Sequence, residues 1–104
     1  MLYFSDINNR KIRFTHERKN HFEQNHPEMV KQESKIKETL LLPDKIVLSK
    51  TDSEVELFYK YFENTPVNAK HLCVVVKSSG GDNFIITSYF TDTIKKGKLI
   101  WIKK

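Results

Sequence analysis

The sequence predicts an α+β fold in which two N-terminal helices pack on one face of a twisted antiparallel sheet of about four to five strands. Met29, Ile36 and Leu40 recur at helical spacing and make one apolar stripe. After Pro43 the chain changes to short runs rich in β-branched and aromatic residues, separated by polar turns. A chain of 104 residues is long enough for one hydrophobic core, so we expect a single domain over residues 1–104.

The first half of the chain predicts one strand and the two helices. Residues 11–14 (KIRF) alternate charged and apolar side chains, which is the period of a half-buried strand. Thr15 is a good N-cap for a short helix over residues 16–24. Pro27 favours a first helical turn, so we expect a second helix from there to about Leu41.

The second half of the chain predicts strands joined by turns. Runs of β-forming composition cover residues 45–49, 55–62, 72–76, 84–89 and 99–102. The apolar run 72–76 predicts a central strand, and residues 78–83 (SSGGDN) predict a hairpin turn. Because the helices would cover one face of the sheet, the other face must be partly open or covered by loops. An open face of this kind is where we expect a site.

Composition narrows the class of protein. The formal net charge of +5 and the pI near 9.3 favour a polyanionic partner. No apolar run approaches the roughly 20 residues that span a bilayer, and the first residues lack the features of a secretory signal. We therefore expect no membrane segment and a cytoplasmic location. Cys73, the only cysteine, stands in an apolar run and is expected to be a buried thiol.

Three of the four histidines, His16, His21 and His26, fall within residues 15–28 at intervals of five. Steps of five rotate successive side chains by about 140° around a helix, whereas metal-binding helices place their ligands four residues apart. We therefore expect no metal and no cofactor. No local motif supports a serine or cysteine nucleophile, and the glycines of the hairpin turn lack the lysine and helix of a nucleotide-binding loop.

Metal-free cleavage of RNA suits these residue types better. It needs a group that takes the proton of the ribose 2′-hydroxyl, a group that protonates the leaving 5′-oxygen, and cations or hydroxyls that stabilise the phosphorane. Histidine can serve as acid or base because it titrates near neutral pH. The candidate catalytic residues are His16, His21, His26, Lys60, Thr87 and Tyr89, and the candidate RNA-binding residues are Arg13, Arg18, Lys19, Tyr61, Lys95 and Lys96.

Structural roles compete with these assignments. His26 precedes a proline and can simply cap a helix, and His21 can hydrogen-bond a backbone carbonyl. Thr87 and Tyr89 are also ordinary strand residues, since both types favour sheets. His71 begins a strand and is expected to be structural or solvated.

Between Ile12 and Trp101 the chain contains, in order, THERKNHFEQNHPEM, LLLPDKI, VELFYKY, LCVVVK and FIITSYFTD, the last followed by IKKG and LIW. This pattern resembles a bacterial and phage-associated family in the barnase–EndoU–colicin–RelE superfamily of metal-independent ribonucleases. The resemblance implies N-terminal helices followed by an antiparallel sheet, and site roles for the candidate catalytic residues. The family usually has an arginine where this chain has Lys60, which keeps the charge but loses bidentate phosphate binding.

The expected function is that of a small toxin-like or phage-derived endoribonuclease that acts without metal. His21 or His26 would be the general base, the other histidine or Tyr89 the acid, and the product a 2′,3′-cyclic phosphate. The expected partners are RNA and an antitoxin or immunity protein, and the sequence leaves the oligomeric state open. Two alternatives also stay open: a non-catalytic RNA- or protein-binding module on the same fold, and an enzyme with a substrate other than RNA.

Overall fold

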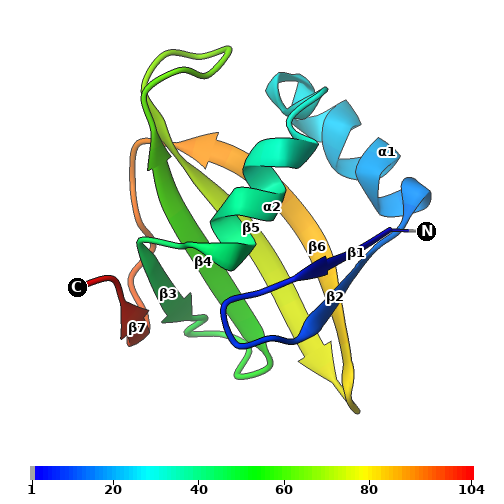
Figure 1. Ribbon diagram of the computed structural model, residues 1–104, viewed down its shortest axis with the longest axis vertical. Helices are drawn as coiled ribbons and strands as arrows, with labels where there is room; N and C mark the ends of the chain where they lie inside the picture. The colour runs from blue at the N-terminus through cyan, green and yellow to red at the C-terminus, as the bar shows by residue number, and fades with distance from the viewer. Residues whose placement is uncertain (1) are drawn as a thin grey trace.

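The computed structural model describes residues 2–104, which form one mixed seven-stranded sheet with two α-helices and a short 3-10 helix (Figure 1). The strands lie in the order β1-β2-β6-β5-β4-β3-β7. None of the helices in this range is long and apolar enough to cross a membrane. In chain order the elements are β1 (Leu2–Ser5), β2 (Lys11–Phe14), α1 (His16–Asn25), η1 (Pro27–Met29), α2 (Glu33–Leu41), β3 (Lys45–Leu48), β4 (Val55–Phe62), β5 (Lys70–Ser79), β6 (Asp82–Thr91) and β7 (Lys98–Ile102).

The prediction of two helices on an antiparallel sheet of four to five strands is wrong. The sheet has seven strands, and β2 pairs with β6 in parallel through Ile12–Asn83 and Arg13–Phe84. The sequence did not predict β1, because LYFS, unlike KIRF, does not alternate polar and apolar side chains, yet β1 pairs with β2 in antiparallel register. The β1–β2 hairpin therefore extends the sheet beyond β6 and makes it mixed.

The second helix is shorter than the sequence predicts. Pro27–Met29 forms one 3-10 turn, and Lys31 then has a φ of 64°, in the left-handed region that interrupts a right-handed helix. The helix α2 begins two residues later. The apolar stripe is nevertheless confirmed as core, since Met29, Ile36 and Leu40 are all buried.

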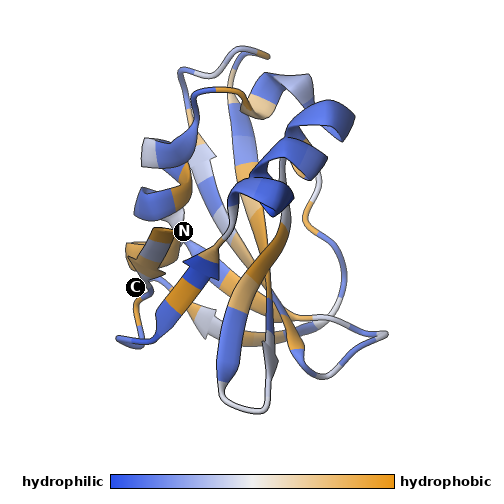
Figure 2. Ribbon diagram, turned by 90° about the vertical axis from the view of Figure 1, so that its right-hand side faces the viewer, coloured by the Kyte–Doolittle hydropathy of each residue, from blue (hydrophilic) through white to orange (hydrophobic). Residues whose placement is uncertain are grey.

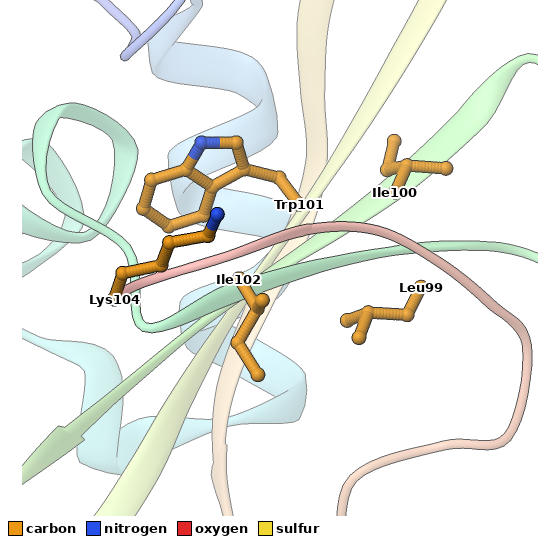
Figure 3. A pocket seen from close by; sticks show the side chains of 5 residues that line it. All are labelled: Leu99, Ile100, Trp101, Ile102 and Lys104. Atoms are coloured by element: carbon orange, nitrogen blue, oxygen red, sulfur yellow. The ribbon is translucent and has the colours of Figure 1, made fainter.

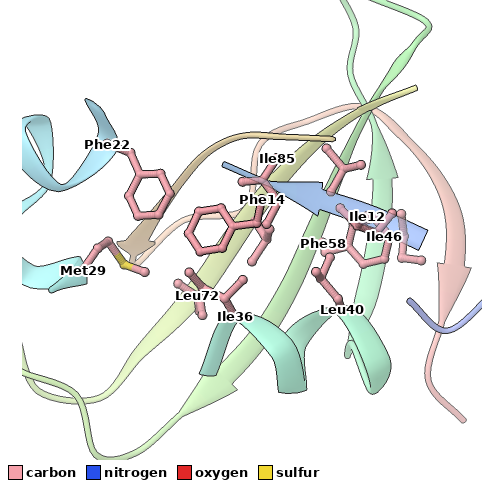
Figure 4. Close-up of a cluster of buried hydrophobic side chains, with 12 residues drawn as sticks. Ile12, Phe14, Phe22, Met29, Ile36, Leu40, Ile46, Phe58, Leu72 and Ile85 are labelled. Atoms are coloured by element: carbon pink, nitrogen blue, oxygen red, sulfur yellow. The ribbon is translucent and has the colours of Figure 1, made fainter. Parts of the chain in front are cut away.

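The helices lie on one face of the sheet, here called face A. In Figure 1, α2 crosses in front of β4 and β5, and α1 lies beside β6. The Phe14 ring of β2 stacks on the Phe22 ring of α1, with ring centroids 5.5 Å apart. Figure 2 shows that most helical residues are hydrophilic, whereas the strands contain bands of hydrophobic residues. The side chains buried in this core (Figure 4) are Ile12, Phe14, Phe22, Met29, Ile36, Leu40, Ile46, Phe58, Leu72, Val74, Val76 and Ile85.

The opposite face of the sheet, face B, has a second and smaller core. Ile94, from the loop that follows β6, packs against it, and the Lys95 backbone N–H donates a hydrogen bond to the Tyr59 hydroxyl at 3.0 Å. This loop therefore covers part of face B. Cys73 is fully buried, as the sequence predicted. The buried side chains of this core are Val47, Val55, Leu57, Tyr59, Cys73 and Val75.

Candidate active site on the open face of the sheet

A groove of about 350 Å³ opens on face B, opposite α2. Strands β4, β5 and β6 form its floor, and its walls are the turn between β3 and β4 and the loop after β6. We call it the face-B groove. Its lining residues are Ser49, Lys50, Thr51, Val55, Leu57, Val75, Thr87, Tyr89, Lys95 and Lys96.

The strand register places Thr87 and Tyr89 in this groove. Across β5 and β6, Thr87 pairs with Val75 and Tyr89 pairs with Cys73. Directly paired residues share a face of the sheet, and both partners belong to the face-B core. The spacing of two residues that made Thr87 and Tyr89 a pair in the sequence therefore puts both on the open face.

Two basic side chains from different elements contact the Tyr89 ring. The His26 imidazole lies with its centroid 5.4 Å from the centroid of the phenol ring, at an interplanar angle of 31°. The Nζ atom of Lys95 lies 5.8 Å from the same centroid. An imidazole, a phenol and an ammonium group therefore meet beside the face-B groove.

The end of α1 holds His26 in this place. His26 follows the last residue of α1, and its backbone N–H donates a hydrogen bond to the Phe22 carbonyl at 2.7 Å. Phe22 is buried in the face-A core and anchors this last turn. The His26 side chain is 35% exposed, and its Nδ1 lies 3.7 Å from the Glu28 carboxylate. Although His26 precedes η1, its side chain makes no capping hydrogen bond within the described chain, so the imidazole is available for other contacts.

Beneath the groove, the hydroxyls of Tyr59 and Tyr89 lie next to the Cys73 thiol. Burial is the main cause that raises the pKa of Tyr89 above its ordinary value. It also raises the pKa of Tyr59 to about 12 and the pKa of Cys73 to about 11. All three groups are therefore protonated at neutral pH. The buried Tyr89 hydroxyl has no oxygen or nitrogen partner among residues 2–104.

His71 lies on the same face, although the sequence did not single it out as a site residue. It pairs with Tyr61 on β4 and lies two residues from Cys73 along β5. This register puts His71 diagonal to Tyr89, a relation in which Cα atoms are about 7–8 Å apart. The Tyr61 ring meets the His71 ring edge-on, with centroids 5.2 Å apart. The Nδ1 of His71 is buried without a partner in the described residues, which leaves Nε2 as the nitrogen that can act.

Three sequence candidates lie away from the groove. Lys60 pairs with Leu72, a residue of the face-A core, and its Nζ donates a hydrogen bond to the Leu42 carbonyl at 3.0 Å. His16 and His21 are exposed on α1. Neither imidazole makes a hydrogen bond, ion pair or ring contact with another residue of the described range. Of the histidines in the N-terminal cluster, the structure brings only His26 to Tyr89.

The candidate RNA-binding residues divide in the same way. Lys95 and Lys96 line the face-B groove. Tyr61 belongs to the same face and is 47% exposed, so its ring is open to a stacking partner. Lys95 and Lys96 are therefore placed to contact a ligand in the groove, whereas Tyr61 lies on the same face outside the groove lining.

The remaining candidate cations lie near the start of α1. Arg13 is paired with Asp82 at 2.7 Å, and Lys19 is paired with Glu33 at 2.8 Å. Arg13 and Arg18 line a separate hollow of about 240 Å³. The ion pairs neutralise much of the charge there, so these cations are less available to a polyanion than those of the groove.

Among residues 2–104, no group of three or more His, Cys, Asp or Glu side chains is placed to hold a metal ion. Comparisons with protein families, with curated proteins and with solved structures find no match. The resemblance to the barnase–EndoU–colicin–RelE superfamily therefore stays a prediction from the sequence.

Proposed function

We propose that this protein is a metal-independent endoribonuclease whose active site is the face-B groove. The observation that carries the proposal is the contact of the Tyr89 ring with both His26 and Lys95. The imidazole supplies proton transfer near neutral pH, the phenol a neutral hydrogen-bond donor, and the ammonium group a fixed positive charge. Cleavage of a phosphodiester by a neighbouring hydroxyl uses proton transfer together with cations or hydroxyls that stabilise the phosphorane.

His26 and His71 are the proposed acid and base. Tyr89 stands between them, because α1 flanks β6 on one side and β5, which carries His71, flanks it on the other. One imidazole takes the proton of the 2′-hydroxyl as its oxygen attacks phosphorus, and the other gives a proton to the 5′-oxygen as the P–O bond breaks. The products are a 2′,3′-cyclic phosphate and a 5′-hydroxyl.

We assign Tyr89 the role of hydrogen-bond donor to the phosphorane, a role in which RNA binding exposes the hydroxyl that the free protein buries. Its raised pKa keeps the phenol protonated through the neutral range, so it does not act as the base. Thr87 adds a second hydroxyl on the same strand face, and Lys95 and Lys96 neutralise the phosphate charge from the groove wall.

We expect this activity in the cytoplasm, with RNA as substrate and an antitoxin or immunity protein as partner.

Incubation of the purified protein with total RNA in the presence of EDTA tests the proposal. The wild type should leave 2′,3′-cyclic phosphate and 5′-hydroxyl ends. Tyr89→Phe should cleave about 10²-fold more slowly, the usual cost of removing one donor to a developing charge. Tyr3→Phe is the matched control, since Tyr3 is 52% exposed on β1, and it should cleave like the wild type.

Intact RNA in the wild-type reaction contradicts the proposal. If the protein then binds RNA with an affinity that falls steeply with salt, the non-catalytic binding module is the better account, because counterion release drives such binding. Cleavage that yields 3′-phosphate ends without a cyclic intermediate would contradict the mechanism while leaving RNA as the substrate.

A further inference from the structure

The strand β7 has a free edge. It pairs with β3 on one side, and no strand of residues 2–104 pairs with its other side. Leu99, Ile100 and Ile102 on this strand are 49%, 40% and 48% exposed. Charged residues commonly protect free edges, and here they stand only at the ends, at Lys98 and just after Ile102, so the edge between them is apolar. An apolar free edge indicates a binding surface.

A hollow of about 610 Å³ lies along this strand. Figure 3 shows the Trp101 indole on one side of the β7 backbone and the Leu99 and Ile102 side chains on the other. Apolar side chains therefore flank the exposed backbone on both sides, which is the surface that an added strand contacts. The lining residues are Leu99, Ile100, Trp101, Ile102 and Lys104.

Lysines stand at both ends of this apolar segment. Lys98 begins β7, and Lys103 and Lys104 follow its last residue. None of the three forms an ion pair with a carboxylate in the described part of the chain. A segment with acidic residues at both ends of an apolar centre would therefore match the edge in charge as well as in hydrophobicity.

A second copy of this chain matches the edge poorly. Two β7 strands related by a two-fold axis would run antiparallel, with Lys98 of one copy near Lys103 and Lys104 of the other. Like charges placed opposite each other destabilise a strand pair. The charge pattern thus selects against self-association through this edge.

We propose that the free edge of β7 binds an extended acidic segment of another protein, which adds to the sheet as a further strand. Backbone hydrogen bonds to β7 supply affinity in this mode of recognition, and side-chain pockets supply specificity. Here Leu99, Ile100 and Ile102 contact the apolar centre of the segment, and the lysines contact its acidic ends.

The test uses the whole chain and a synthetic acetylated peptide with two glutamates at each end of a Val-Ile-Val centre. Trp101 is the only tryptophan, so its fluorescence reports directly on β7. The wild type should show a saturable change. Ile100→Ser should bind the peptide about tenfold more weakly, because an exposed apolar contact is lost. Leu2→Ser, which removes a 40% exposed leucine from the opposite edge strand β1, should bind like the wild type.

A second variant and a second peptide keep the test independent of the folding of Ile100→Ser. Lys103→Glu changes a residue beyond the end of β7, and it should weaken binding of the acidic peptide while favouring the same peptide with lysines in place of glutamates. Methylation of the peptide's backbone nitrogens should abolish binding, because strand addition uses these N–H groups.

Three results would overturn the proposal. The first is the absence of a saturable change with the acidic peptide up to millimolar concentration. The second is equal binding of the methylated peptide. The third is a dimer of the free protein in sedimentation that Ile100→Ser dissociates, which would assign the edge to a second copy of this chain.

Discussion

At the scale of single residues, Tyr89 combines two properties that an ordinary strand tyrosine lacks. Its ring contacts His26 and Lys95, which come from other elements. Its buried hydroxyl has no oxygen or nitrogen partner in the described residues. Burial also keeps it protonated, together with Tyr59 and Cys73. In the proposed site the histidines therefore transfer protons, and Tyr89 only donates a hydrogen bond.

The raised pKa values of Tyr59 and Cys73 predict a loss of stability in alkali. These groups have ordinary pKa values of about 10 and 9 in the unfolded chain, and about 12 and 11 in the folded protein. Between the two values the unfolded chain releases protons that the folded protein keeps, so stability falls as pH rises. Thermal unfolding should show a constant melting temperature near neutral pH and a decline from about pH 8.5 upward.

Two variants separate this effect from general alkaline damage. Tyr59→Phe removes one of the raised groups and should flatten the decline, whereas Tyr3→Phe removes an exposed tyrosine and should leave it unchanged. A melting temperature that is constant to pH 11, or equally steep declines in the two variants, would contradict the burial of these groups.

The site could be predicted from the sequence only in part. Thr87 and Tyr89 share a face because of their spacing, and that inference needed no tertiary information. The sequence did not show on which face of the sheet Lys60 lies, because both faces of β4 have aromatic residues. The face of the sheet on which His71 lies could not be predicted either, because the apolar run after it forms a strand buried on both faces, and such a strand shows no alternation.

At the scale of elements, the position of the loop between β6 and β7 depends on the close packing of Gly97 against β3. A Cβ atom at this position would clash with the backbone carbonyl of Leu48 and with the Val47 side chain. Only glycine allows this close approach of two backbones. The loop carries Lys95 and Lys96, so its position decides where the groove wall stands.

Gly97→Ala should therefore destabilise the protein by about 1–3 kcal/mol, the usual cost of forcing an extra carbon into a packed contact. Urea unfolding measures this change, and hydrogen exchange should show faster exchange of the β7 amides. Lys98→Ala, at the next and exposed position, is the control and should stay within about 0.5 kcal/mol of the wild type. Equal stability of Gly97→Ala and the wild type would contradict the close approach.

Elements with strong local signals were predicted well. α1 begins after Thr15, whose hydroxyl accepts a hydrogen bond from the Arg18 backbone N–H at 3.1 Å, as expected of an N-cap. β4 has the predicted bounds, 55–62. The break in the second helix at Lys31 could not be predicted, because lysine is a good helix former and no glycine or proline marks the position.

At the scale of the whole molecule, the cations are distributed unevenly. Most of the lysines that form no ion pair within residues 2–104 lie on β3, on β7 and around the face-B groove, and the others, Lys11, Lys31, Lys35 and Lys37, lie on β2 and on or near α2. The cations near α1 and β2 are instead partly neutralised by carboxylates. The free lysines of this region are Lys45, Lys50, Lys95, Lys96, Lys98, Lys103 and Lys104.

This distribution predicts that binding of a single-stranded nucleic acid weakens with salt through the groove lysines. A 2′-deoxy oligonucleotide serves as a non-cleavable ligand in a filter-binding or anisotropy titration. Replacement of Lys95 and Lys96 by glutamine should reduce the slope of log K against log salt by about 1.4, since each phosphate contact contributes about 0.7. Lys37→Gln, on the exposed side of α2, is the control and should leave the slope unchanged.

An unchanged slope in the double variant would show that the groove is not part of the binding surface.

The overall topology was the feature least predictable from the sequence, because it depends on contacts between residues far apart in the chain. The parallel pairing of β2 with β6 joins residues about seventy positions apart, and no local pattern encodes it.

The most direct test of the central claim compares three histidines, of which His21 and His26 belong to the same short segment and His71 to β5. The cleavage rate of RNA in EDTA is measured for the wild type, His26→Ala, His71→Ala and His21→Ala. The proposed mechanism predicts losses of about 10²–10⁴-fold for His26→Ala and for His71→Ala, the usual contribution of a general acid or base. His21→Ala, which alters an exposed imidazole without contacts in the described chain, should keep a near wild-type rate. Loss of activity in His21→Ala with retention in His26→Ala would contradict the assignment of the face-B groove as the active site.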